Sequence, residues 1–161
     1  MTRLAVENLT VRLPRGADRE LAIEDVSLSL DAGEILCVVG ESGSGKSVTA
    51  SAVMGLLAPG LSVVSGAMRL SGEDLLAKAP EEWRRLRGRR VAMVFQEPMT
   101  ALNPLMTVGR QIGEMWQVHL NLDAASVERR ALAALREVNL PDPEGVLRAY
   151  PHELSGGQRQ R

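Results

Sequence analysis

A glycine-rich segment at residues 40–47 carries the clearest chemistry in this sequence. It reads GESGSGKS and matches the pattern G-x-x-x-x-G-K-[ST]. Glycines let the backbone curl around a phosphate so that several N–H groups point inward. Lys46 then supplies positive charge to the β- and γ-phosphates, and the Ser47 hydroxyl is placed to ligate Mg²⁺. The predicted binding residues are Gly40, Glu41, Ser42, Gly43, Ser44, Gly45, Lys46 and Ser47.

The alternative to a phosphate site is a glycine-rich turn that arose by chance. The four fixed positions of the pattern should co-occur in well under about 1% of chains of this length. The context also favours a phosphate site, because the segment follows an apolar run at 35–39 and precedes a helical pattern at 47–57. The segment therefore predicts nucleoside triphosphate binding, but it does not say what the energy is used for.

A second glycine motif stands at residues 154–161, which read LSGGQRQR. Ser155 is predicted to cap a helix, and Gly156 and Gly157 leave N–H groups free for an anion. One protein rarely needs two such sites for one triphosphate unless two chains share it. The alternative is an ordinary capped helix with flexible glycines.

These two motifs, with VFQEP at 94–98 between them, resemble in sequence and in order the nucleotide-binding domains of ABC transporters. The resemblance covers essentially the whole chain, and LSGGQ is its most specific element. The stretches 95–112 and 150–161 more narrowly resemble the importers of oligopeptides, dipeptides, nickel or glutathione.

The resemblance implies a role for each motif. Residues 40–47 would hold the phosphates of ATP and Mg²⁺. Lys46 would contact the β- and γ-phosphates, and Ser47 would ligate Mg²⁺. Gln96 would reach the Mg²⁺ and the attacking water, and it would sense the membrane partner. A last group would contact the γ-phosphate of ATP held by an opposite subunit: Ser155, Gly156, Gly157 and Gln158.

The resemblance also implies partners and a location. A second ABC nucleotide-binding subunit would complete the site, as a homodimer or a heterodimer. The closure and opening of this dimer would drive transmembrane permease subunits, and a periplasmic or extracellular solute-binding protein would act indirectly. The chain would sit peripherally on the cytoplasmic face of the membrane. The transported solute is not encoded here.

The expected fold is α/β, of the P-loop NTPase class, with an N-terminal antiparallel β subdomain and a helical subdomain. Residues 1–96 would form the β subdomain and phosphate-loop core, and residues 97–161 the remainder of a partial domain. Asn8 should interrupt the first strand, and Asp123 should cap the last long helix. The predicted strands are 3–13, 21–30, 35–39, 63–70 and 91–95. The predicted helices are 47–57, which Pro59-Gly60 would end; 108–119; and 123–139, which Pro141 and Pro143 would end. Residues 81–90 are predicted to be a charged helix end or loop, and residues 97–109 a loop.

The sequence departs from the family in two respects. No aromatic residue or histidine precedes Trp83, so adenine would rest on aliphatic surface near Leu13, with loose discrimination between ATP and GTP. The family's Walker B aspartate, catalytic glutamate, D-loop and switch histidine follow the signature helix and are absent from these 161 residues. We therefore expect a truncated copy that does not hydrolyse ATP alone, with the strands at 35–39 and 91–95 left unpaired.

Composition limits the remaining possibilities. The chain has 161 residues, 45% of them hydrophobic, and a net charge of −1, which favours a globular protein over a disordered or general nucleic-acid-binding one. Cys37 is the only cysteine and is expected in the core; no signal peptide or membrane span is visible. The arginines between 84 and 90 are expected on a solvated surface, with an acidic partner or nucleic acid as the alternative.

Two other functions stay open at this point. A soluble ABC ATPase of DNA repair or translation would use the same nucleotide sandwich, but such proteins usually carry insertions. Here 50 residues separate Lys46 from Gln96 (96 − 46), and no insertion is visible. A nucleotide-binding fragment without catalysis is the other alternative.

Overall fold

The computed structural model describes residues 2–95 and 101–161. The chain divides into two compact units, residues 1–87 and residues 88–161. The first contains a sheet and two short helices, and the second is helical. Nowhere in the described ranges is there a helix with the length and apolar character needed to cross a bilayer.

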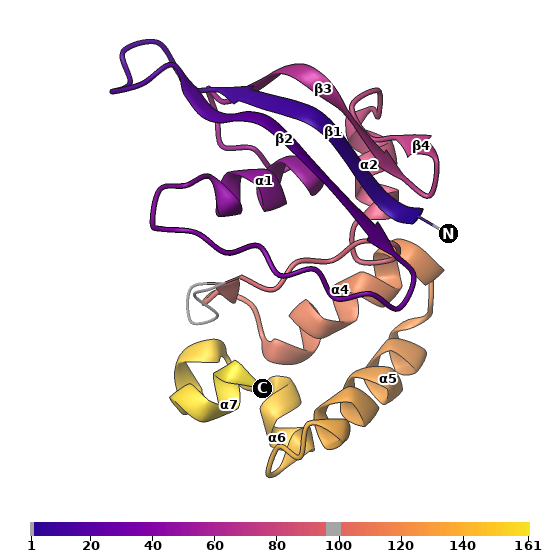
Figure 1. The fold of residues 1–161 in the computed structure, drawn as a ribbon. Coiled ribbons are helices and arrows are strands. Elements are labelled where there is room, and N and C mark those ends of the chain that lie inside the picture. Colours follow the sequence, from indigo (N-terminus) through magenta and orange to yellow (C-terminus); the bar gives the residue numbers. More distant parts are fainter. Residues whose placement is uncertain (1, 96–100) are drawn as a thin grey trace. The chain divides into compact units, whose positions relative to one another are not determined.

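The sheet of the first unit is antiparallel, with the order β2-β1-β3-β4 (Figure 1). This confirms the strands predicted at 3–13, 21–30 and 63–70, because alternating apolar residues place one face of each strand in the core. Its strands are β1 (Thr2–Arg12), β2 (Leu21–Asp31), β3 (Ser62–Leu70) and β4 (Glu73–Asp74).

The predicted irregularity in β1 falls at Asn8. Its φ is 49°, and the pairing with β2 shifts register between Val6 and Leu9. The Asn8 side chain donates to Asp25 Oδ1 at 2.6 Å, and Asp25 also has a positive φ of 52°. Asparagine and aspartate tolerate this left-handed conformation better than other non-glycine residues, so both strands bend at the same point.

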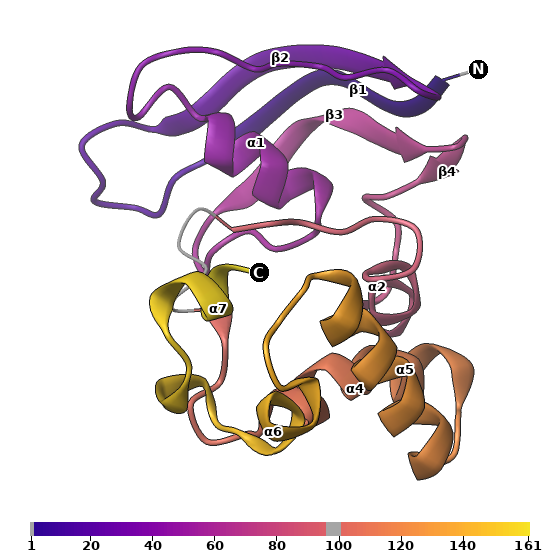
Figure 2. The same ribbon diagram turned by 90° about the horizontal axis from the view of Figure 1, so that it is seen from below.

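Two helices accompany the sheet. Helix α1 (Lys46–Val53) lies against one face of the strands (Figure 2), with Thr49 and Ala52 buried. Helix α2 (Pro80–Leu86) buries Trp83 and Leu86. The core of the unit is aliphatic apart from Trp83; its most buried side chains are Val6, Leu9, Val11, Met68 and Leu75.

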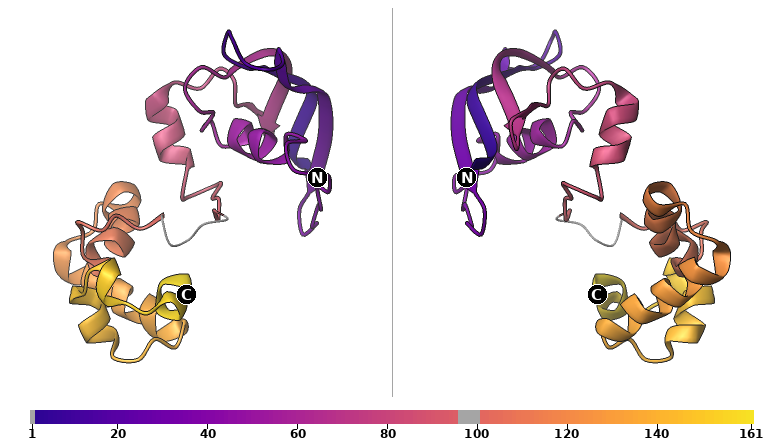
Figure 3. Two further views of the ribbon diagram at one scale, coloured as in Figure 1. Left: turned by 90° about the vertical axis from the view of Figure 1, so that its left-hand side faces the viewer. Right: turned by 90° about the vertical axis from the view of Figure 1, so that its right-hand side faces the viewer.

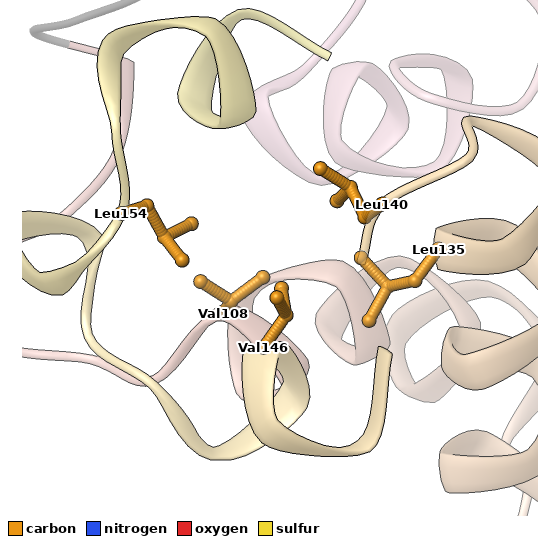
Figure 4. Close-up of a cluster of buried hydrophobic side chains, with 5 residues drawn as sticks. All are labelled: Val108, Leu135, Leu140, Val146 and Leu154. Carbon is orange, nitrogen blue, oxygen red and sulfur yellow. The ribbon is translucent and has the colours of Figure 1, made fainter. Parts of the chain in front are cut away.

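The second unit is built from short helices that follow one another closely (Figure 3). Their apolar faces meet in a core formed by Val108, Leu135, Leu140, Val146 and Leu154 (Figure 4). The helices are α4 (Val108–Leu120), α5 (Ala124–Glu137), α6 (Pro143–Arg148), the 3₁₀ helix η1 (Pro151–Glu153) and α7 (Gly156–Gln160).

The predicted buried strands at 35–39 and 91–95 do not form. Residues 35–39 have no regular structure, and Ile35 and Val39 are 90% and 89% exposed. Only Val91 makes an isolated bridge, and Val94 is 95% exposed. A strand forms only where a neighbour supplies ladder partners, and within the described residues the sheet provides none for either run. Cys37 is consequently exposed, so its prediction as a core residue is wrong.

Two helix boundaries also differ from the predictions. Helix α1 ends at Val53 and not at Pro59-Gly60, because Gly55 (φ 61°) takes up the left-handed conformation that terminates helices. Pro143 does not end a helix; it starts α6, where the missing N–H of proline costs nothing. The predicted cap Asp123 is confirmed, since its side chain accepts from the Ser126 backbone N–H.

Part of the predicted loop at 97–109 lies outside the described residues. Where it resumes, the Gln111 side chain holds it by donating to the carbonyls of Asn103 and Met106 at 3.0 and 2.9 Å. The Gln111 amide oxygen also accepts from the Asn103 N–H at 2.9 Å. The loop is therefore held both by this side chain of α4 and by Asn103, whose Oδ1 accepts from the Leu105 N–H at 3.0 Å.

Candidate nucleotide-binding site

The glycine-rich segment leads directly into α1, whose first residue is Lys46. Gly45 precedes the helix with φ 93°, a conformation that side chains disfavour. A Cβ at Gly45 would also collide with the Ile23 side chain of β2. Glycine is therefore required here both by the backbone conformation and by the close approach of the sheet.

The Lys46 ammonium is folded back into the glycine-rich segment. Its Nζ donates to the carbonyl oxygens of Gly40 at 2.7 Å and Glu41 at 2.6 Å, and to Ser44 Oγ at 3.2 Å. An ammonium has three donors, and all three are directed at the concave side of the segment. The positive charge thus stands where the motif predicts an anion.

The start of α1 adds to the positive potential. No acidic residue stands in its first turn, so the partial positive charge of the helix N-terminus is unopposed locally. Ser47 is exposed in this turn.

A metal ion at this segment would be bound together with the phosphates of the nucleotide. Within the two described ranges, no three histidine, cysteine, aspartate or glutamate side chains gather as a metal site. Mg²⁺ does not need such a cluster when phosphate oxygens and water complete its coordination. Ser47 fits this arrangement, and Gln96, the other predicted ligand, lies outside the described residues.

A residue that sequence reasoning missed also contacts the segment. Arg19, in the connection between β1 and β2, donates from its guanidinium to the carbonyl oxygen of Gly43 at 3.0 Å. The contact joins residues 24 positions apart in the sequence, so no local pattern could reveal it. The only signal was the arginine content of the turn at 14–20.

The second predicted site segment is an ordered helix start. Ser155 and Gln158 form a capping box: the Ser155 N–H donates to Gln158 Oε1 at 2.8 Å, and the Gln158 N–H donates to Ser155 Oγ at 3.3 Å. Arg159 Nε donates to the Leu154 carbonyl at 3.0 Å and fixes the approach to the helix. Gly156 and Gly157 are exposed, with open space where a Cβ would stand. This segment belongs to the second unit and residues 40–47 to the first.

The family model described as ABC transporter matches residues 23–161. The chain belongs to the ABC transporter family. The match spans the glycine-rich segment, α1 and the capped start of α7, which are the features described above.

Curated ABC transporter proteins give a narrower comparison. The chain is 46% identical over 159 residues to the peptidoglycan transport ATP-binding protein YejF of Agrobacterium fabrum, covering 98% of this chain and 29% of that protein. It is 47% identical over 140 residues to the oligopeptide transport ATP-binding protein OppD of Lactococcus lactis, covering 87% and 41%. It is 42% identical over 159 residues to the dipeptide transport ATP-binding protein DppD of Bacillus subtilis, covering 98% and 48%. The chain thus spans less than half the length of these relatives.

Solved structures support the fold. The chain matches the dimeric structure of MJ0796, a bacterial ABC transporter cassette, with a TM-score of 0.78 and 23% identity, covering 98% of this chain and 65% of the other. A post-hydrolysis state of MJ0796 bound to ADP and Pi gives the same values. The expected α/β fold of an ABC nucleotide-binding domain is therefore confirmed.

Proposed function

We propose that this chain binds Mg²⁺-ATP through residues 40–47, as the energy-coupling subunit of an ABC importer for peptides or related small solutes. The observation that carries the proposal is the position of the Lys46 ammonium inside the glycine-rich segment, at the start of α1. The relatives' names, oligopeptide and dipeptide transport ATP-binding proteins, support the solute class.

The roles of individual residues follow from their chemistry. Backbone N–H groups of residues 40–47 surround the phosphates, and Lys46 exchanges its bonds to Gly40 and Glu41 for bonds to phosphate oxygens. Ser47 and Gln96 would hold Mg²⁺, which would neutralise charge on the phosphates. Lys46 and Gln96 then stabilise and orient the groups of phosphoryl transfer.

The proposal extends to a second nucleotide-binding subunit. Ser155, Gly156, Gly157 and Gln158 of one subunit would contact the γ-phosphate held by the other, so that two subunits enclose two ATP molecules head to tail. We place hydrolysis in this head-to-tail dimer. Its closure and opening would move the permease subunits at the cytoplasmic face of the membrane, a two-state switch biased by the ligand.

Titration calorimetry of the full chain with Mg²⁺-ATP tests the binding step. Replacing Lys46 with alanine should weaken binding at least roughly 30-fold, because a charge-assisted contact to phosphate is lost. The control is Arg84→Ala, which removes one exposed positive charge of α2. Equal affinities of the Lys46 variant and the wild type would refute the assigned site.

Dimer formation tests the second segment. Gly157→Asp places a carboxylate where the γ-phosphate of the opposite subunit is expected. The variant should bind Mg²⁺-ATP normally and fail to dimerise in light scattering with ATP. An intact ATP-dependent dimer of this variant would argue against the head-to-tail arrangement, and peptide uptake by vesicles reconstituted with the permease subunits would test the transport role.

A further inference from the structure

We propose that Arg19 is a positioning residue for the phosphates: by holding the Gly43 carbonyl, it keeps the N–H of Ser44 turned toward the bound anion. This inference rests on the proposed function, since it concerns the phosphate end of the same ligand. It gives a role to a residue outside the glycine-rich segment, in the connection between β1 and β2.

The peptide between Gly43 and Ser44 is held at its carbonyl end by Arg19. The guanidinium donates to the Gly43 oxygen at 3.0 Å. In a planar trans peptide, the C=O and the N–H that follows it point in opposite directions. A donor that fixes the carbonyl therefore also fixes the direction of the Ser44 N–H.

The N–H end of the same peptide lies on the side of the Lys46 ammonium. The Ser44 N–H donates to the Glu41 carbonyl at 3.2 Å, and Lys46 Nζ donates to the same oxygen at 2.6 Å. Lys46 Nζ also donates to Ser44 Oγ at 3.2 Å. Two donors thus converge on one oxygen. A phosphate oxygen that replaced it would accept from the Ser44 N–H and from Lys46 together.

Packing does not fix this peptide, because Gly43 has no side chain and has open space where a Cβ would stand. Glycine adopts many backbone conformations at similar energy, so the peptide that follows it can rotate at low cost. After half a turn, the Gly43 carbonyl would point at the anion and repel it. Once the Ser44 N–H leaves Glu41 for a phosphate, the bond from Arg19 still opposes this rotation.

Arg19 is itself presented by an ordered part of the connection. The carbonyl of the next residue, Glu20, accepts from the Leu13 N–H at 2.9 Å, and the Glu20 side chain pairs with Arg12 at 3.3 Å. Because the backbone beside Arg19 is fixed, less conformational entropy is lost when its side chain bonds the glycine-rich segment. A cationic donor on the carbonyl also polarises the peptide, which strengthens the Ser44 N–H as a donor.

Polyphosphate binding with and without a nucleoside tests this role. Dissociation constants of Mg²⁺-tripolyphosphate and Mg²⁺-ATP are measured on the full chain for the wild type, Arg19→Met, Arg19→Lys and the control Arg15→Met. Arg19→Met removes the donor, so it should weaken both ligands by the same factor, roughly tenfold, the value of one hydrogen bond to a charged group. Arg19→Lys keeps a cationic donor and should recover most of the affinity. Arg15→Met removes the same charge from an exposed position of the same connection and should bind both ligands like the wild type.

Amide hydrogen exchange followed by NMR gives a local readout. In the wild type, saturating Mg²⁺-tripolyphosphate should slow exchange at the Ser44 N–H. In saturated Arg19→Met this protection should fall, while protection of the Thr49 N–H, which donates to the Gly45 carbonyl at 2.8 Å, should stay unchanged. An equal loss at Thr49 would show that Arg19 supports the fold and not this one peptide, and it would overturn the inference.

Four binding results would also overturn the inference and leave the proposed function standing. Unchanged tripolyphosphate affinity of Arg19→Met would mean that the Ser44 N–H is directed without Arg19. Equal weakening by Arg15→Met would make net charge responsible, and no recovery in Arg19→Lys would exclude a donor role. Weakening of ATP alone would place the effect at the nucleoside. A wild-type chain that binds neither ligand would refute the proposed function and this inference with it.

Discussion

The guanidinium of Arg87 lies over the indole of Trp83, 5.0 Å from the ring centroid. The same group donates to the carbonyls of Met54 at 2.8 Å and Gly55 at 2.5 Å, which follow the last turn of α1. Arg87 therefore binds the carbonyls that follow the helix beginning at Lys46. Of the arginines between 84 and 90, this one has a structural role and does not simply coat the surface.

Removal of Arg87 should destabilise the first unit. Arg87→Ala leaves two carbonyls at a helix end without their donor and uncovers Trp83, so we expect a loss of roughly 1–2 kcal/mol in the free energy of unfolding. Urea denaturation followed by tryptophan fluorescence, in a Trp116→Phe background so that Trp83 alone emits, measures it. Arg84→Ala and Arg85→Ala, on the same helix and exposed, should change stability little. An unchanged midpoint for Arg87→Ala would show that these interactions contribute nothing to the free energy of unfolding.

Gly45→Ala should impair both folding and binding. The new Cβ would meet Ile23 in a backbone conformation unsuited to alanine, and we expect a loss of at least roughly 2 kcal/mol with a clear fall in Mg²⁺-ATP affinity. Gly72→Ala is the matched control, since Gly72 has a similar φ of 85° and open space around the position. Gly72→Ala should lose only the stability that the strained backbone costs, and it should bind ATP normally. Equal effects of the two variants would contradict the role given to the Ile23 contact.

The cap of α5 predicts a dependence on pH. The Ser126 backbone N–H, and after it the Ser126 hydroxyl, donate to Asp123 and lower the pKa of its carboxyl below the ordinary value of 3.8. Because the folded pKa is the lower one, the charged cap stabilises the fold above 3.8, and this contribution is lost as the pH falls through the folded pKa.

Asp123→Ala should therefore lower the unfolding midpoint at neutral pH, and its difference from the wild type should shrink in strong acid. Asp123→Asn keeps an accepting oxygen, so its own cap should not change with pH. The urea midpoints of the wild type and the two variants, measured from neutral pH into strong acid, test this prediction. A difference that stays constant into acid would exclude the charged carboxylate as its source.

The core of the helical unit gives a prediction of stability alone. Leu135 of α5 is 3% exposed and packs with Val108 and Val146 (Figure 4). Leu135→Ala should cost roughly 2–4 kcal/mol, because the cavity cannot be filled by its rigid neighbours. Val118→Ala, at a side chain that is 43% exposed, should cost much less. Thermal unfolding of both variants tests the difference, and similar melting temperatures would contradict the assigned core.

The sequence allowed the antiparallel strands, the bend at Asn8 and the cap at Asp123 to be predicted. Each depends on neighbours a few residues away: alternation of apolar residues, an asparagine that tolerates positive φ, and a carboxylate before a helix. The apolar runs at 35–39 and 91–95 were expected to be strands left without partners, but they do not form strands, because a strand needs hydrogen-bond partners from distant residues. The contacts of Arg19 and Arg87 were missed for the same reason, since each joins a side chain to backbone carbonyls in a separate element.

The exposed apolar run at 35–39 has a practical consequence for handling the protein. Ile35 and Val39 present almost their whole side chains to water, and the backbone beside them offers pairing groups to any other strand. Two molecules that meet at this run could pair their backbones and bury these side chains, so self-association should rise with concentration. An aspartate at position 35, five residues before Gly40, would act as a gatekeeper and keep preparations dispersed.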